Sequence, residues 1–297
     1  MLRLLCPAPL RMTLCLLVLL LIGGCSVVRL GYSHLNSVAT WMAHDYFDLN
    51  TEQRDNFARQ FDRLHAWHRY EQLPEYAQFL EDMQKRAQRG LQTADMLWLI
   101  DGFRQRYAKI AVRAAADSAD LLATLSPAQI EHFRKELEQN NRKFLRENRS
   151  EASETERRKV YEQKTLSQLH EWLGHLSDAQ EARIIALLKS VPLVDRLRHE
   201  DRLRRQREFM VLMEQRNGDR KVFAQRLSDW LVHWEAGRSP RQAQLLDESW
   251  QKRAEFYAAV DRMLSTEQRS HLVFRLQDYI DNFRQLSERK PTIAKSS

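Results

Sequence analysis

The chain has 297 residues, of which 43% are hydrophobic, and 47 Lys and Arg against 40 Asp and Glu give a formal net charge of +7. That length allows one large domain or two small ones with hydrophobic cores. All three cysteines lie within the first 25 residues, which excludes an internal disulfide, a cysteine-ligated zinc site and a cysteine nucleophile from the rest. Only 8 Gly and 7 Pro occur and few stretches alternate apolar with polar residues, so the chain is predicted to be all-α.

The first 25 residues have the pattern of an export signal. Arg3 and Arg11 precede an uncharged run, residues 12–22, which is too short to span a bilayer because a spanning helix needs about 20 residues. The stretch LIGGC, which ends at Cys25, resembles the lipobox of bacterial lipoproteins. This resemblance implies that residues 1–24 are removed as a signal peptide and that Cys25 is lipidated.

Lipidation would determine where the protein resides. Each buried methylene contributes about 0.8 kcal/mol, so two or three acyl chains hold a protein at a membrane essentially permanently. Ser26 follows the cysteine, which by the sorting rule of enteric bacteria favours the outer membrane. We expect an outer-membrane lipid anchor on the periplasmic face of a Gram-negative bacterium, with the membrane as a partner and no nucleic acid. Loss of Arg3 and Arg11 leaves 45 basic against 40 acidic residues, a mild excess that favours a solvated helical surface.

The rest of the chain is predicted as a series of helices that follow a lipidated segment and tether, residues 25–50. Helix-breaking residues separate them: Pro74, Gly90, Pro127, Gly174, Pro192, Gly218, the turn 237–240 and Pro291. The longest predicted helix, residues 93–125, has one apolar stripe, formed by Leu97, Ile100, Tyr107, Ile110, Ala114, Leu121 and Leu125.

Short connections favour antiparallel neighbours, so we expect an elongated array or bundle of long antiparallel amphipathic helices. Its predicted parts are an N-terminal helical half, residues 51–150, a C-terminal helical half, residues 151–290, and a disordered tail, residues 291–297. The polar stretch 150–158 is interpreted as a linker between the halves.

A five-residue motif recurs four times, as LNTEQ at 49–53, LSPAQ at 125–129, LSDAQ at 176–180 and LSTEQ at 264–268, with a degenerate form, RSPRQ, at 238–242. Its second residue suits a helix N-cap, and the Gln three residues later can accept a hydrogen bond from the cap's own N–H, which makes a capping box. Each copy is interpreted as a tight helix-to-helix corner. The candidate motif residues are Leu49, Gln53, Leu125, Ser126, Gln129, Leu176, Ser177, Gln180, Leu264, Ser265 and Gln268.

This motif is similar to the Leu-Thr-x-x-Gln motif of the Spy and CpxP group of periplasmic helical proteins, with Ser or Asn in place of Thr at the cap. Those proteins are cradle-shaped chaperones and envelope-stress regulators that carry two motifs and assemble as dimers, so four motifs imply, as one interpretation, two fused halves. Most of the chain also resembles an uncharacterised Gram-negative lipoprotein family, catalogued as a domain of unknown function. That resemblance rests on Cys25–Tyr32, Trp41, Tyr46–Leu49, Gln53, Leu73–Tyr76 and Leu125–Asn141.

The sequence contains no pattern typical of an enzyme: a Gly-rich phosphate loop, a Gly-x-Ser-x-Gly elbow and a His-Glu-x-x-His helix are all absent. We therefore predict no catalytic residue and no cofactor. His65, His68 and Glu71 are spaced three apart and could form a metal face, but this spacing is weak evidence and an exposed helix surface is the preferred interpretation.

The predicted helix 193–216 is strongly basic, and Arg198, Arg202, Arg204 and Arg205 are candidates for contact with client proteins or lipid headgroups. A solvated face braced by neighbouring carboxylates is the alternative. The function favoured by the sequence is that of a non-enzymatic, membrane-anchored binding protein with a chaperone-like role for unfolded or assembling envelope proteins. A metal-responsive or envelope-stress regulator and a structural lipoprotein that recruits an assembly partner remain alternatives, and the oligomeric state is open.

Overall fold

The computed structural model describes residues 25–288, with side chains from residue 29 onward. The predicted signal peptide and C-terminal tail lie outside these residues, as does the side chain of Cys25. Regular structure within 25–288 is helical only, which confirms the all-α class. No helix in this range is long and apolar enough to cross a membrane. The helices are α2 (Cys25–Ser33), α3 (Leu35–Phe47), α4 (Thr51–Trp67), η1 (His68–Gln72), α5 (Leu73–Arg89), α6 (Thr93–Ala123), α7 (Pro127–Asn148), α8 (Glu154–Leu173), α9 (Asp178–Leu188), α10 (Asp195–Glu214), α11 (Arg220–Val232), α12 (Pro240–Asp261) and α13 (Thr266–Glu288).

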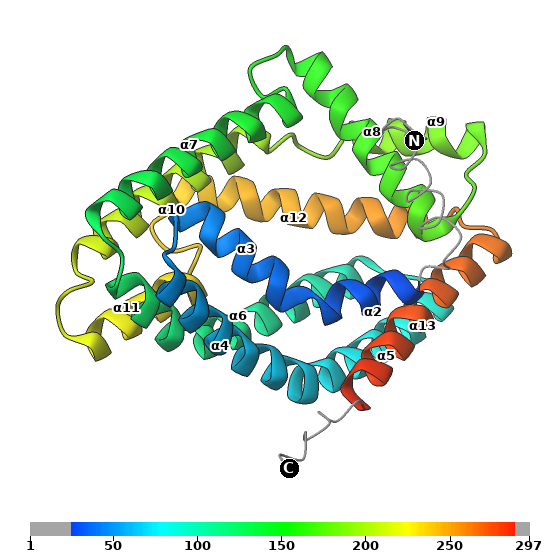
Figure 1. Ribbon diagram of the computed structural model, residues 1–297. Coiled ribbons are helices and arrows are strands. Elements are labelled where there is room, and N and C mark those ends of the chain that lie inside the picture. Colours follow the sequence, from blue (N-terminus) through cyan, green and yellow to red (C-terminus); the bar gives the residue numbers. More distant parts are fainter. Residues whose placement is uncertain (1–24, 289–297) are drawn as a thin grey trace, which may run out of the picture.

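The helices are arranged as an open frame (Figure 1). α7 and α8 lie along one side, α4, α5 and α13 lie along the opposite side, and α12 runs between the two sides. α5 packs against α13, while α6 packs against both α11 and α12. The array of helices predicted from the sequence is therefore present, with its members placed around a hollow rather than in a solid bundle.

Two hydrophobic cores hold this frame together. The first combines α5, α8, α9, α12 and α13 around fully buried residues such as Ile184 and Leu188. The second combines the C-terminal end of α6 with α10 and α11 around residues such as Leu49 and Phe223. Burying each such side chain contributes about 1.5–3 kcal/mol. Both cores contain residues from 51–150 and residues from 151–290, so each of these two ranges contributes to both cores.

The long helix α6 buries only part of the predicted stripe. Leu121 of the stripe and Leu125, just after the helix, are buried, whereas Tyr107 is 43% exposed. Several other buried positions of α6 are small residues, among them Gly102, and a Cβ built at Gly102 would lie 2.3 Å from the ring of Phe79. The helix and the burial of the C-terminal end of its stripe were correctly predicted, but apolar periodicity does not detect the burial of its small residues.

Pro74 does not end a helix, contrary to the sequence-based prediction. α4, η1 and α5 run continuously from residue 51 to residue 89, and η1 is a five-residue π-helical segment that ends two residues before the proline. Proline lacks the N–H of an ordinary helical turn and its ring crowds the carbonyl one turn back. The wider π turn, in which the Leu73 N–H donates to the His68 oxygen, accommodates both effects.

Two segments predicted to be irregular are ordered. Residues 25–47, expected to be a tether, form α2 and α3, and these helices pack on α13, α4 and α7. The polar stretch 150–158, expected to be a linker, is a short turn followed by the first residues of α8, whose cap is Ser153. Arg196 donates to the Ser150 oxygen at 2.9 Å, and this hydrogen bond holds the turn against α10.

Candidate functional site

Each of the four motifs starts a helix through a capping box. At the first motif, the Asn50 side chain accepts from the Gln53 N–H at 2.9 Å and the Gln53 side chain accepts from the Asn50 N–H at 3.0 Å. Ser126, Ser177 and Ser265 cap α7, α9 and α13 in the same way. The degenerate fifth copy also caps α12 through Ser239 and Gln242. Leu49, Leu125 and Leu176 are buried, and Leu264 packs against the first core.

The motifs also act in pairs across the fold. Gln53 and Gln129 exchange hydrogen bonds between their side-chain amides, at 3.2 and 2.6 Å, and Gln180 and Gln268 do the same, at 2.9 Å in both directions. The first motif is thus paired with the second, and the third with the fourth.

Within a pair, each glutamine donates a further hydrogen bond to the carbonyl two residues before its partner's cap. Gln180 reaches the Met263 oxygen at 3.1 Å, and Gln268 reaches the His175 oxygen at 2.7 Å. A motif glutamine therefore caps its own helix and fixes the turn of a second one. Gln242 of the fifth copy lacks this partnership, since its amide donates only to Glu200 among the described residues. The motifs are structural elements that fix the corners of the frame.

The four candidate arginines of α10 have different surroundings. Arg204 is fixed by Asp201 at 2.7 Å, by Glu208 at 2.6 Å and by the Trp234 oxygen at 3.0 Å. Arg202 donates to Asn141 on α7. The helix therefore does not present one continuous basic face.

Arg204 belongs to a network around Asp201, which also accepts from Arg238 at 2.8 Å. Burial acts to raise the pKa of the Asp201 carboxyl, but the hydrogen bonds and charges of Arg238 and Arg204 outweigh it and hold that pKa below its usual range. This network ties α10 to the turn before α12, so Arg204 has a structural role.

Arg205 and Arg198, in contrast, face the hollow of the frame. Arg205 stacks on the Trp230 ring, 4.0 Å from its centroid, and donates to the Trp230 oxygen. Burial lowers the pKa of its guanidinium. Together with the aromatic side chains described next, Arg205 lines a part of the hollow that is open to solvent.

This open part, here called the aromatic groove, has a volume of about 490 Å³ and lies between α6, α10 and α12. Phe103 and Tyr107 lie in it with 56% and 43% of their surface exposed. Arg104 completes its rim, paired with Glu235 at 3.2 Å. The residues that line the groove are Ile100, Phe103, Arg104, Tyr107, Arg205, Trp234 and Trp250.

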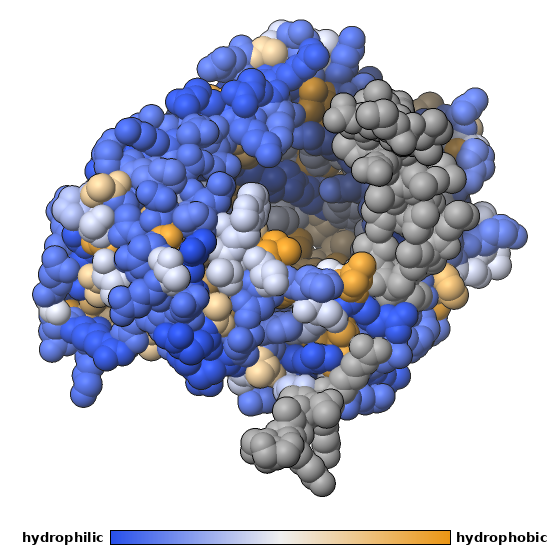
Figure 2. Space-filling model, viewed as in Figure 1, coloured by the Kyte–Doolittle hydropathy of each residue, from blue (hydrophilic) through white to orange (hydrophobic). Residues whose placement is uncertain are grey.

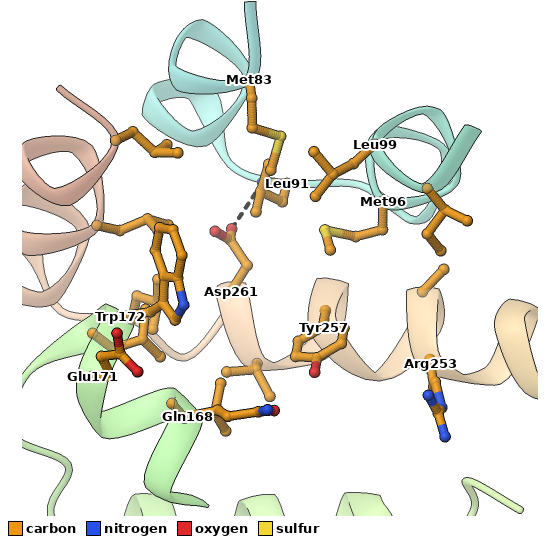
Figure 3. A pocket seen from close by; sticks show the side chains of 18 of the residues that line it. Met83, Leu91, Met96, Leu99, Gln168, Glu171, Trp172, Arg253, Tyr257 and Asp261 are labelled. Carbon is orange, nitrogen blue, oxygen red and sulfur yellow. Dashed lines mark hydrogen bonds between the residues drawn. The ribbon is translucent and has the colours of Figure 1, made fainter. Parts of the chain in front are cut away.

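The groove continues into a deeper apolar cavity of about 530 Å³, with which it shares Ile100, Phe103 and Trp250. Figure 3 shows its walls: Met83 and Leu91 on one side, Met96 and Leu99 on α6, and Trp172 on α8. The space-filling view shows the hollow in one face of the molecule, with hydrophobic side chains in its depth and a hydrophilic rim (Figure 2). A concave apolar surface of this size is typical of ligand-binding sites.

The histidines considered for a metal face are engaged with an aromatic residue. His68 is hydrogen-bonded to the Tyr32 hydroxyl at 2.8 Å, and the Tyr32 ring lies 4.5 Å from the ring of His65. Burial lowers the pKa of both imidazoles. Within residues 25–288, no group of three or more His, Cys, Asp or Glu is arranged to hold a metal ion.

Sequence reasoning missed the residues of α12 that line the hollow. Trp250, Arg253 and Tyr257 lie three and four residues apart, so they share one face of the helix. That spacing could have been found in the sequence as a candidate binding face, although it does not show that this face lines the hollow.

Comparison with known proteins gives a family but no activity. No curated protein matches the chain, and no solved structure matches it. The model of a family of unknown function, DUF6279, matches residues 45–242, which include the first three motifs and most of the aromatic groove. Because this match covers more than half of the chain, the protein belongs to the family of unknown function DUF6279.

Proposed function

We propose that this protein is a non-enzymatic, membrane-anchored lipoprotein of the bacterial envelope that binds unfolded or assembling proteins. The observation that carries the proposal is the aromatic groove, in which large apolar side chains are left exposed next to cationic ones. Exposed apolar side chains gathered in a concavity are typical of sites that bind other molecules.

The groove suits extended polypeptide segments that mix apolar and acidic side chains. Phe103 and Tyr107 offer aromatic surface, and Arg205 offers a guanidinium that can bind carboxylates and stack on rings. The open side of the groove admits a chain from solvent. The paired motifs keep the frame rigid, so the groove is present before a client arrives, which lowers the entropic cost of binding.

The anchor in this proposal is Cys25, and it is supported by the lipobox-like sequence. α2 begins at that residue and packs against α13, so acyl chains on Cys25 would attach to the helical body without a long tether. Periplasmic location and an outer-membrane anchor follow from the same sequence features. The resemblance of the motifs to those of the Spy and CpxP group adds support for a chaperone-like role.

The test is suppression of aggregation. The chain 26–297 retains both cores, whose buried residues all lie between Leu49 and Leu276, and it is mixed at near-equimolar ratio with a chemically unfolded model client. We expect suppression by this chain and its loss in the variant Phe103→Ser/Tyr107→Ser. The control is Phe274→Ser, which removes an aromatic side chain that is 62% exposed but does not line the groove.

Equal suppression by the groove variant would show that the groove is not the binding surface. No suppression at several-fold excess of the unsubstituted chain would contradict the chaperone-like role and would favour an adaptor with a dedicated partner.

A further inference from the structure

Two arginines lie together where the apolar cavity opens into a smaller recess of about 230 Å³. Arg198 on α10 and Arg253 on α12 both line the recess, and their guanidinium carbons lie 5.8 and 5.4 Å from the centroid of the Trp250 ring. Arg253, Gln168 and Tyr257 line both spaces, so the recess and the cavity are continuous. Figure 3 shows Arg253 and Gln168 away from Met96 and Leu99, at the edge of the apolar walls.

Neither guanidinium is neutralised by the protein. Among the described residues, neither Arg198 nor Arg253 makes a side-chain hydrogen bond or an ion pair; Arg198 lies near the Trp250 ring, and Arg253 lies near the rings of Trp250 and Tyr161. The Nε of Arg253 is buried without a hydrogen-bond partner. A buried guanidinium N–H without an acceptor is costly unless a bound molecule supplies one.

The carboxylates that line these spaces are already paired with other cations. Asp195 pairs with Arg157 at 3.0 Å. In the cavity, Glu171 pairs with Arg275 at 3.2 Å and Asp261 with Arg269 at 3.0 Å. None of these carboxylates forms an ion pair with Arg198 or Arg253, and the charge of Asp195 only partly offsets that of Arg198.

The positive charge at this point is concentrated. Burial and the neighbouring charge of Arg253 lower the pKa of Arg198 to about 10, so the Arg198 guanidinium is still cationic at neutral pH. Lys164 also lines the recess and adds to its positive potential. Two cations held close together are destabilising, and an anion placed between them would remove that cost.

We propose that the cavity and the arginine pair form one binding site for a single-chain anionic amphiphile, with its carboxylate or phosphate on Arg198 and Arg253 and its hydrocarbon chain between Met96, Leu99 and Trp172. Arginine binds both headgroup types in a bidentate manner. The apolar walls bury the hydrocarbon chain, and each buried methylene adds to the affinity. A polyphosphate or sugar would leave those walls without a partner.

This site adjoins the aromatic groove that carries the proposed function, because its cavity shares Ile100, Phe103 and Trp250 with the groove. The arginine pair lies on the side of the recess, and neither Arg198 nor Arg253 lines the groove. The two proposals are distinguishable because Arg198→Gln/Arg253→Gln leaves Phe103 and Tyr107 of the groove in place.

The experiment measures binding of dodecanoate, dodecyl phosphate and the neutral 1-dodecanol to the chain 26–297 by titration calorimetry, with quenching of tryptophan fluorescence by a brominated fatty acid as a second readout. Acetate and inorganic phosphate serve as headgroups without a chain. The variant is Arg198→Gln/Arg253→Gln, and the control is Arg207→Gln, an exposed arginine on α10 that does not line either space.

We expect saturable binding of at least one anionic amphiphile at submillimolar concentration, and the preferred one identifies the headgroup as carboxylate or phosphate. The double variant should weaken that binding about tenfold or more, because it removes the charged hydrogen bonds to the headgroup. It should leave 1-dodecanol binding unchanged, which also shows that the cavity is intact. Arg207→Gln should behave as the unsubstituted chain.

Three results would overturn the proposal. The first is that neither anionic amphiphile binds saturably. The second is that the double variant and the unsubstituted chain bind the anionic amphiphiles equally well. The third is that acetate or phosphate binds as tightly as the amphiphiles. The last result would mean that the arginines bind small anions without the cavity.

Discussion

The exchanged hydrogen bonds between Gln180 and Gln268 lead to a quantitative prediction about stability. Gln268→Ala removes the cap to Ser265, the bond to the His175 oxygen and both bonds to Gln180. At about 0.5–1.5 kcal/mol for each of these four hydrogen bonds, the free energy of unfolding should fall by about 2–6 kcal/mol. Gln180→Ala should cost a similar amount.

The double variant distinguishes a paired corner from two independent caps. Once one glutamine is gone, both bonds of the pair are already lost, so the second substitution should cost about 1–2 kcal/mol less than it does alone. The matched control is Gln242, which caps α12 but has no glutamine partner. Gln242→Ala should cost about 1 kcal/mol, and its effect should add to that of Gln268→Ala within about 0.5 kcal/mol.

The assay is urea unfolding of the chain 26–297 at neutral pH, followed by far-UV circular dichroism and by tryptophan fluorescence. Coincident transitions are needed before free energies of unfolding are compared. A coupling energy near zero between Gln180 and Gln268 would refute the paired-corner account and reduce the motifs to ordinary helix caps.

Three further predictions follow from packing, charge and the anchor. Gly102→Ala should destabilise the fold by about 1–3 kcal/mol, because the new Cβ would overlap the facing phenylalanine ring at 2.3 Å. At Gly31 a new Cβ would have nothing within 4 Å, so the control Gly31→Ala should be neutral or stabilising. Thermal melting measures both. Asp201→Asn should cost about 3 kcal/mol, since it removes the carboxylate charge that two buried guanidiniums share and leaves them only the ion pairs with Glu208 and Glu235. Asp117→Asn at an exposed ion pair should cost less than about 1 kcal/mol. Because folding lowers the pKa of Asp201, its stabilisation should be present at neutral pH and lost as the pH falls below about 4, and the Asn variant should have a flatter pH dependence of unfolding there. Cys25→Ala should abolish incorporation of labelled palmitate and prevent cleavage at this site in cells; unchanged labelling would contradict the anchor.

Much of the helical organisation was predictable because its signals are local. Gly90, Gly174 and Gly237 have positive φ angles, which glycine adopts readily, so the helix ends and turns at these residues could be predicted from the sequence. The capping boxes are equally local, since cap and glutamine are three residues apart. The predicted helix end at Pro74 was wrong because a π-helical turn accommodates the proline, and nothing in the neighbouring sequence indicates that turn.

The pairing of corners and the position of the hollow were not predictable in the same way. Gln53 and Gln129 meet across 76 residues, and a capping motif does not identify its partner. Part of the buried face of α6 is formed by glycine and alanine, which contribute little to an apolar periodicity. Arg198 and Arg204 lie six residues apart on one basic helix, yet one is fixed in a network and the other faces the recess; only the neighbouring helices decide this.

The most direct test of the central claim, that the aromatic groove binds polypeptide, is photo-crosslinking. A photoreactive residue is placed at position 103 in the groove or at position 274 outside it, and each chain is irradiated with an unfolded client. The account predicts crosslinks to the client from position 103 and few or none from position 274. Equal crosslinking from both positions, or none from position 103 while aggregation is still suppressed, would contradict it.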